Sequence, residues 1–224
     1  MFLTRMYLNP TRLTTRRMLT SPQVTHALVM GAIPPGAGSR RVLWRIDRRN
    51  DHKVELYVTS TSEPDLTGIV EQAGWPTRAA WQTADYSRFL GRLAPGQRWM
   101  FRLTANPTRA VASERGRRGR VTPCRTVGQQ TDWLLSRANR AGFKIPSTEL
   151  DALQIELRER STASFDRRSG DSHRERRDRV SLTRATYEGM LEVQDPEKLR
   201  ESLTEGIGRA KGYGCGLMTL APVR

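Results

Sequence analysis

The chain has 224 residues, of which 37% are hydrophobic and 27% are charged, so its composition is that of a folded domain rather than a disordered one. It carries 38 basic against 23 acidic residues, a formal net charge of +15, and all but four of the basic residues are arginines. Because a guanidinium can fork onto phosphate and stack on bases, this surplus predicts a nucleic-acid partner. The sequence contains no apolar run of membrane-spanning length, no signal-peptide pattern and no zinc motif around Cys124 or Cys215. We therefore expect a cytoplasmic protein that does not bind membranes.

The first half of the chain follows the order strand, helix, strand, strand, helix, strand. Ser21 is a suitable N-cap, Pro22 occupies the favoured first helical position and Gly31 is a stop signal, so 21–31 is predicted to be a helix. Apolar residues between turn signals predict the other elements, which are strands at 2–9, 41–47, 53–60 and 85–90 and a short helix at 65–73.

The same order restarts after the turn at 94–96. A strand at 97–105 ends before Asn106-Pro107, as the first strand ends before Asn9-Pro10. The predicted elements that follow are a helix at 127–141, strands at 150–157 and 180–193, a helix from 195 to about 204 and a strand at 215–221. The sequence thus predicts an α+β fold of two tandem ferredoxin-like (β-α-β-β-α-β) domains, at 1–93 and 94–224.

A glycine-rich segment, from Gly206 to Gly216, stands just before the last predicted strand. Its spacing fits neither a dinucleotide-binding loop nor a Walker loop, and no helix follows it. One interpretation is a turn that enters a closing strand. The other, which we favour because the segment carries two cations, is contact with phosphate through backbone amides. The candidate nucleic-acid-binding residues of this segment are Gly208, Arg209, Lys211, Gly212 and Gly214.

Several stretches resemble one family in the same order along the chain. The segment GIGRAKGYGCGLMTLAP resembles the terminal glycine-rich signature of CRISPR-associated repeat-RNA endoribonucleases. The helix SPQVTHALVMGA and the stretches VLWRID, FRLTANPTR and YEGMLEVQDPEKL resemble the CasE branch, which serves Cascade-type (type I-E) systems. This resemblance covers essentially the whole chain.

The resemblance implies a fold, an activity and partners. Members of this family have tandem ferredoxin-like domains, in agreement with the element order. They cleave precursor CRISPR RNA within each repeat, usually at the base of a short hairpin. The 2′-hydroxyl attacks the adjacent phosphate and gives 2′,3′-cyclic phosphate and 5′-hydroxyl ends without a metal or other cofactor. The implied partners are the repeat hairpin and other Cascade subunits, with the product retained and the free enzyme monomeric.

His26 is the candidate catalytic residue. Of the three histidines, His52 lies in a charged turn and His173 among arginines, whereas His26 lies on the first predicted helix. An ordinary half-buried helix histidine is the alternative interpretation. The resemblance favours the catalytic one, because imidazole titrates near pH 6.5 and can accept or deliver a proton at neutral pH.

One position departs from the family pattern. Some relatives have a tyrosine three residues before the histidine that assists the reaction, whereas this chain has Gln23, a possible neighbour of the active site. Glutamine can hydrogen-bond but cannot act as a general acid. Lys211 is therefore a candidate to stabilise the charge on the phosphorane.

An arginine-rich segment at 158–184 holds nine arginines against five acidic residues. It is predicted to be either a solvated hairpin with mixed charges or a grip on the RNA backbone. In relatives a basic strand pair lies along the RNA hairpin, which favours the second interpretation. Its candidate RNA-binding residues are Arg158, Arg160, Arg167 and Arg168. A second basic run at 115–125 is predicted to be a loop that contacts RNA or another subunit.

Two other functions stay open. A non-catalytic subunit on the same fold would bind the hairpin without cutting it, and Gln23 is compatible with that role. A ribosome-associated or DNA-binding protein is the third alternative, although the sequence has no helix-turn-helix or zinc pattern. No cluster of carboxylates suggests a two-metal nuclease site, so we expect no metal ligands.

Overall fold

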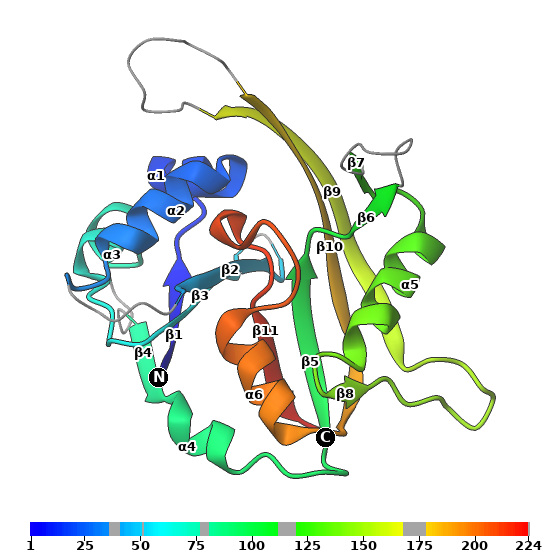
Figure 1. Cartoon of the computed structure of the whole chain (residues 1–224). Coiled ribbons are helices and arrows are strands. Elements are labelled where there is room, and N and C mark those ends of the chain that lie inside the picture. Colours follow the sequence, from blue (N-terminus) through cyan, green and yellow to red (C-terminus); the bar gives the residue numbers. More distant parts are fainter. Residues whose placement is uncertain (36–40, 51, 77–80, 112–119, 168–177, 224) are drawn as a thin grey trace.

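A computed structural model describes residues 1–35, 41–50, 52–76, 81–111, 120–167 and 178–223 of the chain, with side chains left out at 164–167 and 178–180. The first sheet is antiparallel, in the order β2-β3-β1-β4 (Figure 1). This order, with helices after the first and third strands, is that of a ferredoxin-like unit. Its strands are β1 (Phe2–Leu8), β2 (Leu43–Arg48), β3 (Val54–Ser60) and β4 (Trp81–Asp85). Its helices are α1 (Leu13–Thr20), α2 (Pro22–Gly31) and α3 (Thr67–Ala73), and α4 (Tyr86–Gly91) leads to the second sheet.

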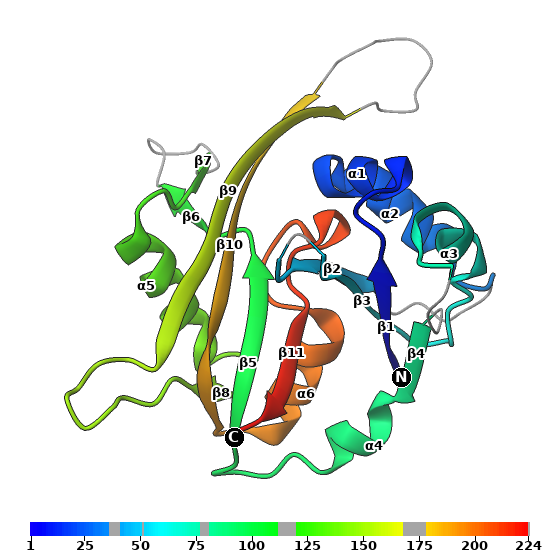
Figure 2. The ribbon, with the colours of Figure 1, turned by 180° about the vertical axis from the view of Figure 1, so that it is seen from behind.

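The second sheet repeats this arrangement, in the order β11-β5-β10-β8, with β9 also paired to β10 (Figure 2). Its strands are β5 (Arg98–Ala105), β8 (Phe143–Lys144), β9 (Ile155–Arg167), β10 (Asp178–Val193) and β11 (Met218–Pro222). Its helices are α5 (Val127–Ala138), α6 (Pro196–Glu205) and the short 3-10 helix η1 (Lys211–Tyr213). A small hairpin, β6 (Thr108–Val111) with β7 (Arg120–Pro123), precedes α5.

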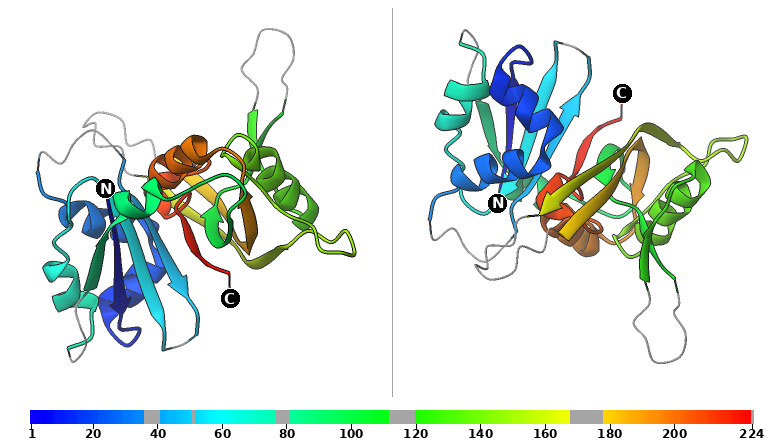
Figure 3. Two further views of the ribbon diagram at one scale, coloured as in Figure 1. Left: turned by 90° about the horizontal axis from the view of Figure 1, so that it is seen from below. Right: turned by 90° about the horizontal axis from the view of Figure 1, so that it is seen from above.

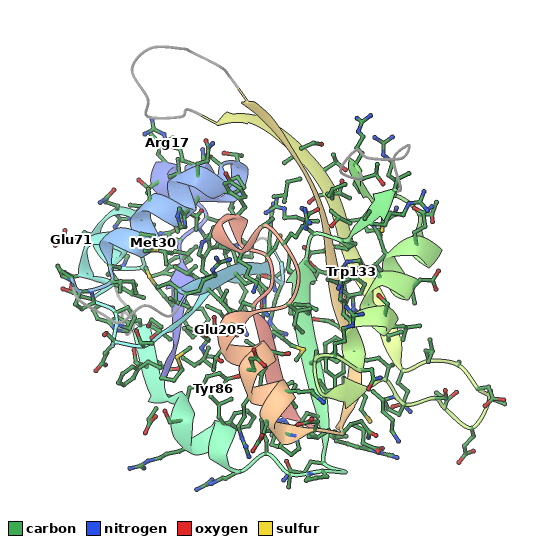
Figure 4. The ribbon with its side chains drawn as sticks, in the orientation of Figure 1. Arg17, Met30, Glu71, Tyr86, Trp133 and Glu205 are labelled. Atoms are coloured by element: carbon green, nitrogen blue, oxygen red, sulfur yellow. The ribbon has the colours of Figure 1, made fainter. Side chains whose placement is uncertain are left out.

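Each sheet has its own apolar core. In the first, Met6, Leu56 and Val58 from the strands pack with Val29 of α2 and Ile69 of α3. In the second, the strands β5 and β10 pack against α5 and α6, and Trp133, labelled on α5 in Figure 4, stacks on the Tyr187 ring. Seen from below or above, the two sheets form two lobes side by side (Figure 3).

A buried charged cluster joins the two lobes. The Arg45 guanidinium, 1% exposed, forms two hydrogen bonds of 2.7 and 2.8 Å with the Asp47 carboxylate. It also donates to the carbonyls of Arg102 and Leu217, in the second lobe. Arg102 in turn pairs with Asp47 at 3.2 Å and with Glu188. Because both residues of β2 reach into the second sheet, this cluster fixes how the lobes meet.

Most predicted elements are present, but two of them are corrected by the structure and one helix was missed. The predicted strand at 85–90 is wrong: β4 ends at Asp85, whose side chain accepts a hydrogen bond from the Ser87 amide and begins α4. A helix at Leu13–Thr20 was not predicted, because only two of its side chains, Thr15 and Met18, are buried. The strand predicted at 150–157 begins at Ile155.

Candidate nucleic-acid interface

The structure brings His26 and the glycine-rich segment together. Helix α2 begins where predicted, since the Ser21 side chain accepts a hydrogen bond from the Val24 amide and Pro22 follows it. Helix α2 packs against η1, and a Cβ atom placed on Gly212 would lie 3.8 Å from Cε1 and 3.9 Å from Nδ1 of His26. The half-buried imidazole therefore lies beside the glycine-rich segment, as Figure 1 shows for the two elements.

The His26 Nδ1 atom is buried and has no hydrogen-bond partner among the residues that the structure describes. Buried polar atoms are normally hydrogen-bonded. Within the described residues, His26 thus lacks the hydrogen bond that a purely structural histidine would make through this nitrogen.

The glycines of the segment differ in the structural constraint that each position imposes. Gly208 and Gly214 have φ angles of +84° and +77°, and a Cβ atom would lie 2.9 Å from the Trp133 ring and 2.6 Å from the Trp44 ring, respectively. Backbone conformation and packing thus require glycine at both positions. Gly212 has neither constraint, because its Cβ would make only ordinary contact with His26. The backbone of the glycine-rich segment therefore lies close to the imidazole at this position.

The two candidate cations of the segment lie in different surroundings. Arg209 is exposed, whereas the Lys211 ammonium donates to the backbone carbonyl of Glu205, the last residue of α6 (Figure 4). Burial lowers the pKa of Lys211, and the positive charge of Arg41 lowers it further, against the opposing effect of Glu205. Lys211 therefore has a structural role at the α6 terminus, whatever it does for a substrate. Gln23 lies half-buried on α2 and already interacts with other groups of the protein.

A polar cleft of about 530 Å³ opens between the two lobes beside this loop. We call it the central cleft. Its walls come from α1 and α2, from β2, from the β9–β10 ribbon and from Gly214. Pro22, one helical turn before His26, belongs to its lining. The cations that line it are Arg48, Arg158, Arg160 and Arg184.

A bulge in the ribbon separates Arg158 from Arg160. The register between β9 and β10 shifts at Thr186/Tyr187, so that Tyr187 faces Leu157 but Thr186 faces Glu159. Arg158 is the bulged residue, which has no partner in the register. Its Nε donates a hydrogen bond to Glu188 Oε2 at 3.0 Å, on the side of the central cleft. Arg160 faces α5, where its Nε donates to Gln130 Oε1 at 2.9 Å. The two arginines thus point to opposite faces of the ribbon, although Arg160 also borders the cleft.

The other predicted basic positions are only partly described. Arg167 ends β9, but its side chain is not described, and Arg168 lies outside the described residues. The basic run at 115–125 was predicted to be a loop; 120–123 form β7, and 115–119 lie outside the described residues.

Arg184 is a cleft residue that the sequence did not single out. It is half-buried on β10, and its side chain makes no hydrogen bond or ion pair within the described part of the chain. Arg158, by contrast, is paired with the carboxylates of Glu156 and Glu188. An unpaired half-buried cation in a cleft is the better candidate for phosphate contact, because binding does not first have to break an ion pair.

We expect Arg184→Ala to weaken binding of repeat RNA and to reduce the slope of log K against log salt by roughly 0.7–0.9, the value for one lost phosphate contact. Titrations of labelled RNA at several salt concentrations would measure both. The matched control is Arg88→Ala, which removes an equal charge from an exposed side chain of α4 that does not line the central cleft. An unchanged slope in Arg184→Ala would show that this cation does not contact phosphate.

Fold and cleft together define a tandem ferredoxin-like α+β protein with a cationic cleft and a glycine loop against a helix-borne histidine. The chain belongs to the family described as CRISPR associated protein, whose model matches residues 1–222. The CRISPR-associated endoribonuclease Cse3 of Thermus thermophilus is 30% identical over 225 residues, covering 99% of this chain and 100% of the relative. The Cascade subunit CasE of Escherichia coli is 29% identical over 133 residues, covering 55% of this chain and 57% of that protein.

The solved structures agree with this family. The structure of Thermus thermophilus Cse3 bound to an RNA representing a pre-cleavage complex has a TM-score of 0.76 and 28% identity, covering 99% of this chain and 98% of that one. The predicted family and the tandem ferredoxin-like fold are thereby confirmed. In the described residues, no helix is long and apolar enough to cross a membrane, and no group of three or more His, Cys, Asp or Glu side chains could hold a metal ion.

Proposed function

We propose that this chain is an endoribonuclease that cuts CRISPR repeat RNA, with the RNA in the central cleft and His26 at the scissile linkage. The observation that carries the proposal is the position of the His26 imidazole, beside Gly212 and next to the cleft. Similarity to the Thermus thermophilus endoribonuclease over the full length of both chains supports the same reaction.

The proposed reaction is a transesterification within the RNA. The 2′-oxygen of one ribose bonds to the adjacent phosphorus, the bond to the 5′-oxygen of the next nucleotide breaks, and the ends are a 2′,3′-cyclic phosphate and a 5′-hydroxyl. One proton leaves the 2′-hydroxyl and one arrives at the 5′-oxygen. His26 takes part in one of these transfers as general base or general acid. We propose that no metal takes part; since the 2′-oxygen of the RNA is the nucleophile, no metal-bound water has to be generated.

Gln23 bears on which group carries out the second proton transfer. Its amide can orient a phosphate oxygen but cannot donate a proton as an acid. We propose that cations stabilise the extra negative charge of the phosphorane, with backbone amides of the glycine-rich segment beside them. Lys211 and Arg209 are the candidates on that segment. A non-catalytic hairpin-binding subunit is the alternative that Gln23 supports.

Cleavage is expected to proceed at an undiminished rate in excess EDTA and to leave a 2′,3′-cyclic phosphate. The experiment incubates repeat RNA from the source organism with the full chain, with EDTA or with Mg²⁺, and resolves the ends after treatment with a cyclic-phosphate-opening enzyme. Intact RNA that stays tightly bound would favour the non-catalytic subunit. Cleavage that stops in EDTA would contradict the metal-free reaction.

We propose repeat hairpin RNA and other Cascade subunits as partners, a cytoplasmic location, and a monomeric free enzyme that keeps its product. Domains at 1–93 and 94–224 stay a prediction; Tyr86, Leu90 and Leu93, just before that boundary, pack in the core of the second sheet.

A further inference from the structure

A second hollow, of about 600 Å³, lies on the other face of the β9–β10 ribbon, between the ribbon, β7 and the start of α5. We call it the outer groove. Its lining contains two arginines, an amide and four hydroxyl groups, with no carboxylate. The lining residues are Pro123, Arg125, Gln130, Arg160, Ser161, Thr162, Ser181 and Thr183.

Arg160 is held in this groove by neutral acceptors. Its guanidinium donates to Gln130 Oε1 and to the carbonyl of Arg125. Gln130 is itself 1% exposed and held in place. Its side-chain amide donates to the Cys124 carbonyl, and its backbone carbonyl accepts from the Tyr187 hydroxyl. Arg160 therefore keeps its full positive charge in a fixed position, with donors left over for a ligand.

Arg125 adds a second uncompensated charge. Its side chain is exposed and makes no hydrogen bond or ion pair with the residues that the structure describes. Exposed hydroxyls on Ser161, Thr162 and Ser181 line the same surface. Arginines and small hydroxyls are the groups that contact phosphate and sugar in nucleic-acid complexes. A protein partner is less suited to this surface, since the centres of protein interfaces are apolar and Pro123 is the only apolar lining residue.

The two hollows meet at one place. Arg160 and Ser161 line both the central cleft and the outer groove. These residues lie on β9, which pairs with β10 along one edge and with no other strand of the described residues along the other. A ligand can therefore pass from one hollow to the other around the free edge of β9. A double helix is too thick and stiff to do so, whereas a single strand can bend around the edge.

We infer that the outer groove binds single-stranded RNA that continues from the hairpin held in the central cleft, through phosphate contacts to Arg125 and Arg160. This inference rests on the proposed function for the position of the hairpin. It assigns Arg160 to the unpaired flank and leaves Arg158 and Arg184 to the hairpin. The bulge that turns Arg158 and Arg160 to opposite faces is then what divides the two RNA-binding surfaces.

The test compares three uncleavable RNAs, each with a 2′-deoxyribose at the scissile position. They are the bare repeat hairpin, the hairpin with a 5′ flank and the hairpin with a 3′ flank, each flank of about eight nucleotides, within the site size of single-strand binders. For the wild-type chain, one flank is expected to lower the Kd by about tenfold, as expected for one or two charge-assisted hydrogen bonds. For Arg125→Ala, the ratio of the Kd for the bare hairpin to the Kd for the extended RNA is expected to fall to near one.

Two further variants guard against a general effect of charge or fold. Thr162→Val removes a hydroxyl from the groove without changing charge and is expected to reduce the same ratio by a smaller factor. Arg88→Ala removes a charge from distant α4 and is expected to keep the wild-type ratio. A flank that adds no affinity in the wild type, or an unchanged ratio in Arg125→Ala, would overturn the inference. Because these RNAs cannot be cut, the result is independent of the EDTA experiment that tests the nuclease.

Discussion

In His26→Ala, the single-turnover rate of repeat RNA cleavage is expected to fall by about 10²–10⁴-fold, the usual cost of removing a general acid or base. The affinity for the RNA is expected to change little, because the cations of the central cleft stay in place. This combination separates a proton-transfer residue from a binding residue, since losing a phosphate contact would mainly weaken binding. The measurement uses enzyme in excess over labelled repeat RNA, with the Kd determined separately on the 2′-deoxy RNA.

The matched control for this experiment is His52→Ala. His52 is exposed in the β2–β3 turn, where its backbone amide donates a hydrogen bond to Asn50 Oδ1. Its replacement is expected to leave both the rate and the Kd at wild-type values. If His26→Ala cleaved as fast as His52→Ala, the catalytic role of His26 would be excluded. If His26→Ala lost rate and affinity by equal factors, His26 would be a binding residue instead.

The parts of the fold that the sequence could predict are those that local chemistry determines. Ser21 and Pro22 begin α2, and Asp195 caps α6 by accepting from the amides of Glu197 and Lys198. Local chemistry also explains the error at 85–90. Asp85 ends β4 and caps α4, and the apolar residues Tyr86, Phe89 and Leu90 that follow it have the i, i+3, i+4 spacing of a helix rather than the alternation of a strand.

The parts of the site that the sequence could not predict depend on pairing between distant strands. Regular alternation would place Arg158 and Arg160 on one face, and only the register between β9 and β10 reveals the bulge that separates them. Arg184 was one of many arginines in the segment, and only the assembled ribbon and first lobe show that it lines the cleft and that its side chain has no partner among the described residues. The sequence singled out His26 and the glycine segment separately, but their contact at Gly212 depends on the packing of α2 on η1.

The buried cluster between the lobes was also hidden in the sequence, because Arg45 and Asp47 read as ordinary polar positions of a strand. In Asp47→Ala, the free energy of unfolding is expected to fall by about 3–5 kcal/mol, because Arg45 would stay buried without its carboxylate. Urea denaturation at neutral pH would measure the change. The control is Glu156→Ala, whose ion pair with Arg158 joins side chains that are 58% and 53% exposed. That variant is expected to lose less than about 1 kcal/mol.

The pH dependence of the same variant tests the cause of the loss. Burial by itself raises the pKa of the Asp47 carboxyl, but the charges and hydrogen bonds of Arg45 and Arg102 outweigh burial and lower it overall. A carboxyl with a lowered pKa in the folded state stabilises the protein above its ordinary pKa, and this stability is lost as the pH falls toward the lowered value. The gap between wild type and Asp47→Ala is therefore expected to be largest near neutral pH and to narrow in acid. A gap that stays constant from neutral to acidic pH would show that lost packing, rather than the ion pair across the lobes, explains the effect.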